Sequence, residues 1–419
     1  MKKSKFLKTL AFSSLAVVMA AGGIFAFAPI GASASSPPPT TTTGLGLDPK
    51  NDPVVYTTES GLEIRMSNAN KFSGATRTTT NTGKTYTQDL TSFYYFTMGS
   101  FSGTIYTHTN TSYTLSNEPV NWIILGVGSH SSAFIDSVSN YLFSIIKNND
   151  YLFSNGEYYF DNQHETFSPA GQLIDSTISA KTYIMGKVKE SIIVHTDIPK
   201  GCMLVLSEKL LGQCDFNSIS PGVISNRGWG PSSESNYVDL GGGSAGNRYR
   251  YKADNSSGTN GALTWNNKTN GSLFSYINNL FSKSTNGTIL NNSLSFTQVQ
   301  ADLIVPQQLY TYYSNGNGYN YTETFSTDGG TNYTMFPLAS NRALGVTGIQ
   351  NFCMEDYLKT ETQRVASFIG SNQSFFWYLR SGLPSLNYGS DGIKANGSYD
   401  GAGITCAHGV RPAMVMQLN

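Results

Sequence analysis

Oxygen-bearing side chains gather in one glycine-rich stretch near the C-terminal end of the chain. Asp391, Asn396 and Asp400 lie in or beside residues 392–403, which contain several glycines. Calcium binds about six to eight oxygen ligands, and stretches of this composition can supply them. The spacing differs from that of an EF-hand loop, and the same residue types also form ordinary Asx and glycine turns. The stretch therefore suggests either a calcium site, the only cofactor that the sequence indicates, or a series of turns.

Two arginines and a tyrosine close to this stretch are candidate ligand-binding residues. Tyr378 and Arg380 belong to the aromatic run 375–382, and Arg411 lies in a Val-Arg-Pro segment. A guanidinium has five donors for a ligand, and an aromatic ring can stack on a sugar. In a buried strand the same guanidinium would instead bond to backbone carbonyls or to one carboxylate, and this structural role is the preferred interpretation. Trp377 is expected to pack into the core.

No recognised catalytic motif accompanies these residues. The five histidines show no metal-binding spacing, and the chain has no nucleophile elbow, P-loop or dinucleotide fingerprint. Cys353 or Cys406 could form a thiol–imidazole pair with His408, although a disulfide or a buried thiol is the commoner state in an exported protein. An enzymatic activity is therefore left open, and its absence is favoured.

Four cysteines offer a disulfide framework: Cys202, Cys214, Cys353 and Cys406. Four cysteines allow three pairings. We favour the pairing Cys202–Cys214 with Cys353–Cys406, because the first closes a short loop and the second ties a helical segment to the last loop. Free buried thiols are the alternative.

The elements that must position these residues are strands with a few helices. Apolar runs at 119–126 and 203–207 predict buried strands, and the aromatic stretch 91–106, broken by two glycines, predicts a hairpin. Residues 183–195 have the composition of a strand. Helical spacing recurs at 134–147 and 273–281, and Thr297 to Gln300 forms a capping box. Residues 374–381 and 410–418 are the closing strands, and 217–260 and 311–332 are long loops.

Several of these pieces, taken in order, resemble a known family. The pieces are Pro119, Trp122 and Leu125; Leu204–Ser207; Thr264-Trp265 before a helix; Phe336–Ser340; Trp377-x-Leu379-Arg380-Ser381; and Gly409-Val410-Arg411-Pro412-Ala413. Together they resemble an uncharacterised bacterial extracytoplasmic domain family that ends in W-x-L-R-S and G-V-R-P-A motifs.

More distantly, the ending is similar to the formylglycine-generating-enzyme branch of the C-type-lectin-like fold. The resemblance implies an α+β protein with a C-type-lectin-like or related mixed fold, β-rich with a few helices and long loops. Enzymes of that branch oxidise their substrate with a close cysteine pair. Cys353 and Cys406 are far apart in sequence, so this activity is not implied.

The first 50 residues predict export. Basic residues, an apolar run and Ala32-Ser33-Ala34 form a signal peptide over residues 1–34, although the apolar run is also long enough for an uncleaved anchor. Residues 35–50 are a Pro/Thr-rich linker. We expect a β-rich N-terminal extension at 51–114 and the main domain at 115–419. No transmembrane segment is expected after the signal is removed, so the protein would be secreted or associated with the cell wall.

Composition narrows the possible partners. The chain has 27 basic and 27 acidic residues, and only 13% of residues are charged. Nucleic acid is an unsuitable partner because phosphate binding needs a basic surface. The preferred interpretation is a cell-surface or extracellular module that binds a glycan or a protein. A secreted hydrolase of cell-wall or polysaccharide substrates, with Asp302, Glu355 and Asp356 as candidate carboxylates, is the alternative, and a structural envelope component is a third.

Overall fold

The computed structural model describes residues 45, 47–67, 84–85, 93–106, 112–149, 158–161, 166–169, 178–214, 216, 237–239, 249–251, 273–283, 288–290, 293–314, 323–341, 350–382, 389–403 and 407–418. The expected signal peptide, most of the linker and Cys406 lie outside these ranges. Within the described part of the chain, no helix is long and apolar enough to cross a membrane.

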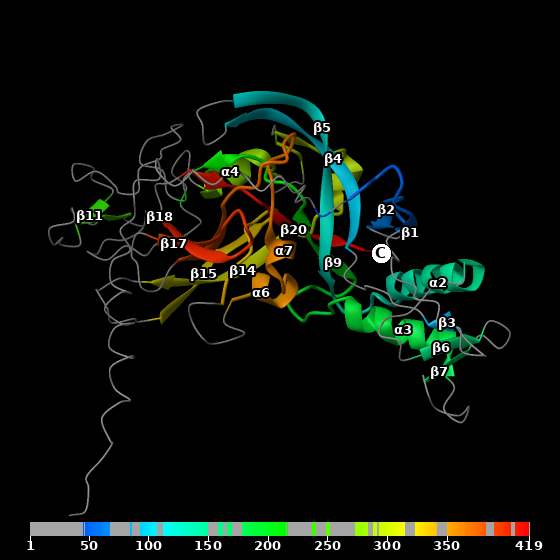
Figure 1. The fold of residues 1–419 in the computed structure, drawn as a ribbon. Coiled ribbons are helices and arrows are strands. Elements are labelled where there is room, and N and C mark those ends of the chain that lie inside the picture. The colour runs from blue at the N-terminus through cyan, green and yellow to red at the C-terminus, as the bar shows by residue number, and fades with distance from the viewer. Residues whose placement is uncertain are drawn as a thin grey trace, which may run out of the picture. The chain divides into compact units, whose positions relative to one another are not determined.

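A seven-stranded antiparallel sheet carries the core (Figure 1). Its strands, in spatial order, are β1 (Val54–Thr57), β2 (Glu63–Met66), β4 (Tyr94–Tyr106), β5 (Ser112–Val127), β9 (Cys202–Ser207) and β20 (Ala413–Gln417), and β13 (Leu294–Ser295) pairs with β4. All six residues of β9 are buried, since the strand lies between β5 and β20. The buried strand predicted at 203–207 is confirmed, and so is the one at 119–126.

The stretch predicted as an aromatic hairpin is instead a single strand, β4, whose partner is β5. Its glycines mark irregularities in the pairing rather than a turn, because the register shifts between Thr97 and Ser100 and again between Phe101 and Gly103. Gly99 has a φ of 69°, a conformation that favours glycine. The bulge there leaves room for the ring of Phe296, which would lie 2.5 Å from a Cβ atom at this position.

Two helices, α2 (Ser132–Asn149) and α3 (Ala180–Ser191), pack side by side (Figure 1). The helix predicted at 134–147 is confirmed, but the strand expected at 183–195 is wrong for most of its length. Ile184 and Val188 lie four residues apart and are both fully buried, as one helical face requires. The four-residue spacing of the apolar residues therefore indicated the secondary structure of this segment better than its content of β-branched residues did. A small sheet of β3 (Lys84–Thr85), β6 (Tyr158–Asp161), β7 (Thr166–Pro169) and β8 (Ile178–Ser179) leads into α3.

A five-stranded sheet holds the closing segments. Its order is β10 (Gln213–Cys214), β19 (His408–Gly409), β16 (Trp377–Gly382), β17 (Gly389–Ile393) and β18 (Tyr399–Gly403). β16 and β19 run parallel, and the other pairs in this sheet are antiparallel. The hairpins β14 (Gln307–Ser314)–β15 (Glu323–Tyr333) and β11 (Tyr237–Asp239)–β12 (Tyr249–Tyr251) are separate ribbons.

Short helices complete the described chain: α4 (Leu273–Leu280), α5 (Gln298–Asp302), α6 (Met354–Tyr357) and α7 (Glu361–Arg364). The capping box at Thr297 is present, with both reciprocal bonds to Gln300. The protein is thus a β-rich α+β structure with mainly antiparallel sheets.

The expected boundary at residues 114/115 falls inside β5. β1, β2 and β4, which belong to the expected N-terminal extension, share one sheet with β9 and β20 of the expected main domain. The described strands on the two sides of this boundary therefore form a continuous sheet.

Candidate functional site

The three candidate ligand-binding residues of the closing motifs lie in the interior. Tyr378, Arg380 and Arg411 are each 1% exposed. The Arg411 guanidinium donates to three backbone carbonyls, those of Ser207 (2.9 Å), Arg364 (3.3 Å) and Glu208 (3.3 Å). Burial lowers the pKa of Arg411 to about 9, and the Glu208 carboxylate opposes that shift. The predicted burial and carbonyl bonding of Arg411 are confirmed.

Arg380 braces a second junction. Its guanidinium donates to the carbonyls of Pro337 (3.0 Å) and Tyr310 (3.3 Å), and to the backbone carbonyl and side-chain oxygen of Asn351. Asn351 in turn accepts a bond from the Tyr310 backbone N–H and donates one to the Gln308 carbonyl. The Arg380 guanidinium therefore connects β16 to β14 and to the segment before α6.

Tyr378 packs within an aromatic group rather than on the surface. Its ring centroid lies 5.4 Å from that of Phe216, 6.3 Å from that of Phe376 and 5.0 Å from that of His408. Because the side chain is buried, it does not form a surface platform for a sugar. The expected core position of Trp377 is confirmed, and its indole N–H donates to the Arg364 carbonyl at 3.0 Å.

The candidate calcium ligands do not converge. Asp391 pairs with Gly401 across the β17–β18 hairpin, whereas Asp400 pairs with Gly392, so the two carboxylates point to opposite faces of the sheet. Asp400 bonds to the Gly401 N–H and forms an ion pair with Lys394 at 2.9 Å. Asn396 accepts two bonds from Ser398, as in an Asx turn. The described residues contain no group of three or more His, Cys, Asp or Glu side chains able to hold a metal ion.

Neither expected disulfide is formed, since Cys202 and Cys353 carry buried free thiols. Cys202 lies in the seven-stranded sheet and Cys214 in the five-stranded one. The thiol of Cys353 donates to the Gln350 carbonyl at 3.2 Å, and burial raises its pKa. A thiol in this state is a poor nucleophile. Cys406 is outside the described residues.

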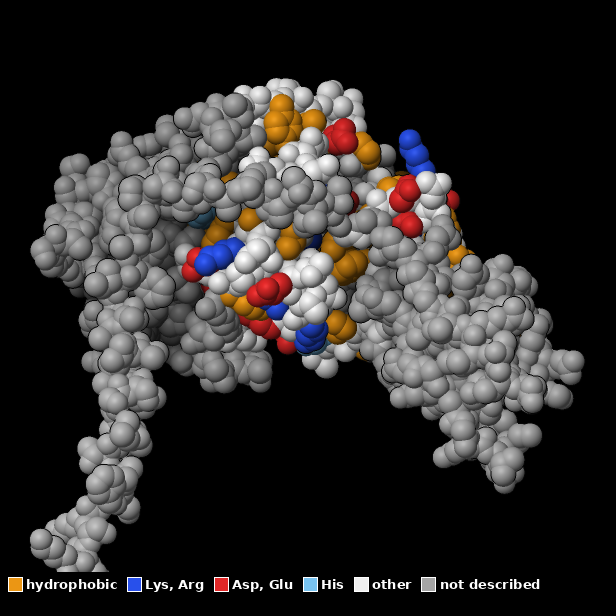
Figure 2. Space-filling view, viewed as in Figure 1, with side chains coloured by type: hydrophobic (Ala, Val, Ile, Leu, Met, Phe, Trp, Pro, Cys, Tyr) orange, Lys and Arg blue, Asp and Glu red, His pale blue; other side chains and the backbone are white. Residues whose placement is uncertain are grey.

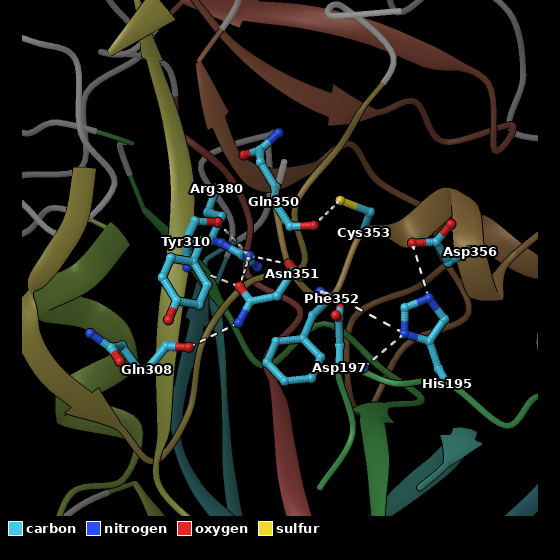
Figure 3. A network of polar contacts seen from close by, with 10 residues as sticks. All are labelled: His195, Asp197, Gln308, Tyr310, Gln350, Asn351, Phe352, Cys353, Asp356 and Arg380. Carbon is cyan, nitrogen blue, oxygen red and sulfur yellow. Dashed lines mark hydrogen bonds and ion pairs between the residues drawn. The ribbon is translucent and has the colours of Figure 1, made fainter. Parts of the chain in front are cut away.

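A partly exposed group of polar residues, which we call the His195 cluster, consists of His195, Asp197 and Asp356 (Figure 3). The imidazole Nδ1 lies 3.7 Å from Asp197 Oδ2, and Nε2 lies 3.7 Å from Asp356 Oδ2. The three side chains are between 27% and 34% exposed. Both distances exceed that of a hydrogen bond, so the carboxylates keep capacity to accept bonds from a ligand.

The cluster is held by rigid backbone on both sides. The His195 N–H donates to the Val127 carbonyl at the end of β5, at 3.0 Å. Asp197 Oδ2 accepts the backbone N–H of Phe352 at 3.1 Å (Figure 3). Phe352 has a φ of 53°, which is rare for a bulky residue, and its buried ring stacks on Phe336. Backbone strain of this kind often accompanies functional sites.

The electrostatics of the cluster are unusual for surface carboxylates. Burial raises the pKa of Asp356, while His195 and Lys359 lower it by a smaller amount. The ring of Tyr357 lies 5.4 Å from the imidazole, and its buried hydroxyl has no hydrogen-bond partner among the described residues. Burial raises the pKa of this phenol, and the charges of Asp197 and Asp356 raise it further. The accessible groups of the cluster are thus the two carboxylates, and such acceptors suit a ligand rich in hydrogen-bond donors.

The three carboxylates considered for a hydrolase point to different partners. Asp302 bonds to Lys283 and Gln298, Glu355 bonds to Ser340 and the Asn341 N–H, and Asp356 faces His195. A glycosidase needs two carboxyl groups on either side of the scissile bond. Asp197 and Asp356 do flank a common point, but the imidazole occupies it.

One face of the molecule carries charges of both signs. In the described part of the face shown in Figure 2, acidic and basic side chains are scattered among uncharged ones, and neither sign forms a continuous patch.

The comparisons with known proteins found no matching family model, curated protein or solved structure. The site therefore has to be judged from its own geometry. Sequence reasoning named Asp356 and missed His195 and Asp197. The available signal was the spacing His-x-Asp directly after a predicted element, but its partner lies more than 150 residues further along the chain.

Proposed function

We propose that this chain is an exported binding module that holds a glycan at the His195 cluster. The observation that carries the proposal is the geometry of that cluster, in which two carboxylates are accessible and lie beyond hydrogen-bond distance from the imidazole between them. Sugar hydroxyl groups are donors that such carboxylates accept. A phosphate-bearing ligand would meet two like charges and is disfavoured.

An exposed aromatic ring is connected to this cluster through residues 351 and 352. Tyr310 is 44% exposed, and Figure 3 shows it and Asp197 on either side of Asn351 and Phe352. Its backbone is fixed by the side chain of Asn351. A rigid tyrosine presents an apolar face and a polar tip, a combination that suits the ring and hydroxyl groups of a sugar.

The family resemblance and the C-type-lectin-like fold belong to the same proposal. Their support is that the two closing motifs lie side by side, since Trp377 of β16 pairs with Gly409 of β19. Export is supported by the residues around Ala32-Ser33-Ala34, and the mature chain is expected to begin at Ser35. Recovery of the chain from the wall or medium with Met1 intact would contradict cleavage.

The binding proposal is tested with a glycan array and a cell-wall pulldown, using the chain from Ser35 onwards. The double variant Asp197→Asn, Asp356→Asn should lose glycan binding, by at least about ten-fold if two charge-assisted bonds are removed. Asp302→Asn, which changes an exposed carboxylate bonded to Lys283, is the matched control and should bind as the wild type does.

Capture of a protein but no glycan would overturn the choice of ligand. Release of sugars from wall material during the assay, lost in the double variant, would favour the hydrolase instead. Equal binding by the double variant would remove the His195 cluster from the site.

A further inference from the structure

The backbone N–H and the carboxylate of Asp197 compete for the imidazole of His195. Its Nδ1 atom accepts the backbone N–H of Asp197 at 3.2 Å, and it lies 3.7 Å from Oδ2 of the same residue. A neutral imidazole nitrogen can accept a hydrogen bond, whereas both nitrogens of a protonated ring are donors. The Asp197 N–H bond therefore assigns the hydrogen of the neutral ring to Nε2, which faces Asp356 at 3.7 Å.

Protonation changes the role of Nδ1 alone. In both charge states Nε2 carries a hydrogen that points towards Asp356. Once Nδ1 also carries a hydrogen, it repels the Asp197 N–H and attracts the Asp197 carboxylate, which would close from 3.7 Å to a charge-assisted hydrogen bond of about 2.8 Å. The ring is partly exposed, so the proton comes from solvent. The one covalent bond that forms is the bond between this proton and Nδ1.

The carboxylate that would move is the one that holds Phe352. Asp197 Oδ2 accepts the Phe352 N–H at 3.1 Å, while the Phe352 carbonyl accepts the Ala339 N–H at 3.0 Å. A bulky residue at positive φ is strained and persists only when its surroundings hold it. Loss of one of these two bonds should therefore let the strained backbone open locally.

We propose that His195 is a proton switch for the segment 350–353. Protonation of its Nδ1 draws the Asp197 carboxylate from the Phe352 N–H to the ring, and the strained Phe352 backbone loosens. The same segment carries Asn351, which anchors Arg380 and Tyr310, so the switch acts on Tyr310 through Asn351.

The charged and titratable groups around His195 come from two elements. Asp197 lies on its own segment, and Asp356 and Tyr357 face it from α6. Further groups within electrostatic range of these are Glu355, Lys359, Cys353 and Arg380. Asp356 itself titrates, so its contribution has to be separated from that of the ring.

The test follows the Phe352 amide and the His195 ring signals by NMR from pH 8 to pH 5 in the ligand-free chain, so its result is independent of whether the proposed glycan binds. Histidines change charge in this range. We expect both signals to shift with one midpoint, and hydrogen exchange of the Phe352 amide, corrected for intrinsic rates, to quicken on the order of ten-fold across it.

Variants separate the sources of the shift. His195→Gln should abolish the Phe352 titration, and His130→Gln, which changes an exposed histidine just after the end of β5, should leave it intact. Asp356→Asn should keep the coupling, because the Phe352 amide bonds to Asp197 and not to Asp356. A Phe352 amide that titrates alike in His195→Gln, or that stays unchanged while the wild-type His195 ring titrates, would overturn the switch.

Discussion

The guanidinium of Arg411 lies over the indole ring of Trp377, with its Cζ atom 5.1 Å from the ring centroid. The two side chains come from the closing motifs on either side of the β17–β18 hairpin, and both reach the same carbonyl, that of Arg364. A cation over an indole in a desolvated site contributes about 2 kcal/mol. The pair therefore joins the end of the chain to α7 through one buried contact.

Arg411→Ala should lower the free energy of unfolding by about 2–4 kcal/mol, because three backbone carbonyls each lose a donor and the indole face loses its cation. Arg411→Lys should not restore it, since an ammonium lacks the planar fork. Urea unfolding measures both. Lys394→Ala, which removes an exposed ion pair with Asp400, is the control and should change stability by no more than about 0.5 kcal/mol. Intact stability in Arg411→Ala would contradict the bracing role.

Trp377→Ala and Trp122→Ala should each cost about 3–5 kcal/mol, the usual range for emptying a large aromatic site. Both rings are fully buried, and each indole N–H bonds to a backbone carbonyl, that of Arg364 or Met98. Thermal unfolding of the two variants tests this expectation. A midpoint unchanged in Trp377→Ala would mean that the ring is not packed as described.

A matched pair of glycine substitutions tests the bulge in β4. Gly99→Ala should destabilise the protein by more than about 1 kcal/mol, because its φ of 69° is strained for alanine and the Cβ would lie 2.5 Å from the Phe296 ring. Gly186→Ala, in α3, should instead stabilise it by about 0.5–1 kcal/mol, since the new methyl meets no atom within 4 Å. Opposite signs in chemical unfolding confirm the expectation, and equal signs contradict it.

The raised pKa of Asp356 predicts a pH dependence of stability. A carboxyl group whose folded pKa lies above its unfolded value of 3.8 binds more protons when folded, so its contribution to the free energy of unfolding falls as pH rises through that window. Asp356→Asn removes this group. The variant should therefore gain stability relative to wild type as pH increases from 3.5 through the folded pKa, and urea midpoints along that range measure the difference. A difference that is constant with pH would show that the carboxyl does not titrate abnormally.

Local pattern was enough for the elements whose stability is local. The capping box at Thr297 depends only on two residues three positions apart. The sequence of β9 is one apolar run, which is typical of a buried strand. Both elements could therefore be predicted. The burial of Trp377 and Arg411 also followed from their position in apolar closing strands.

Long-range packing decided the rest. Nothing near Gly99 in sequence indicates Phe296, and the composition of 183–195 is β-branched although Ile184 and Val188 pack as a helical face. Cys202 and Cys214 are close in the chain but belong to different sheets. His195 faces Asp356, and Asp197 bonds to Phe352, only because β5 fixes one segment and α6 lies on the other. This juxtaposition depends on the free energy of the whole fold, so neither segment alone indicates its partner.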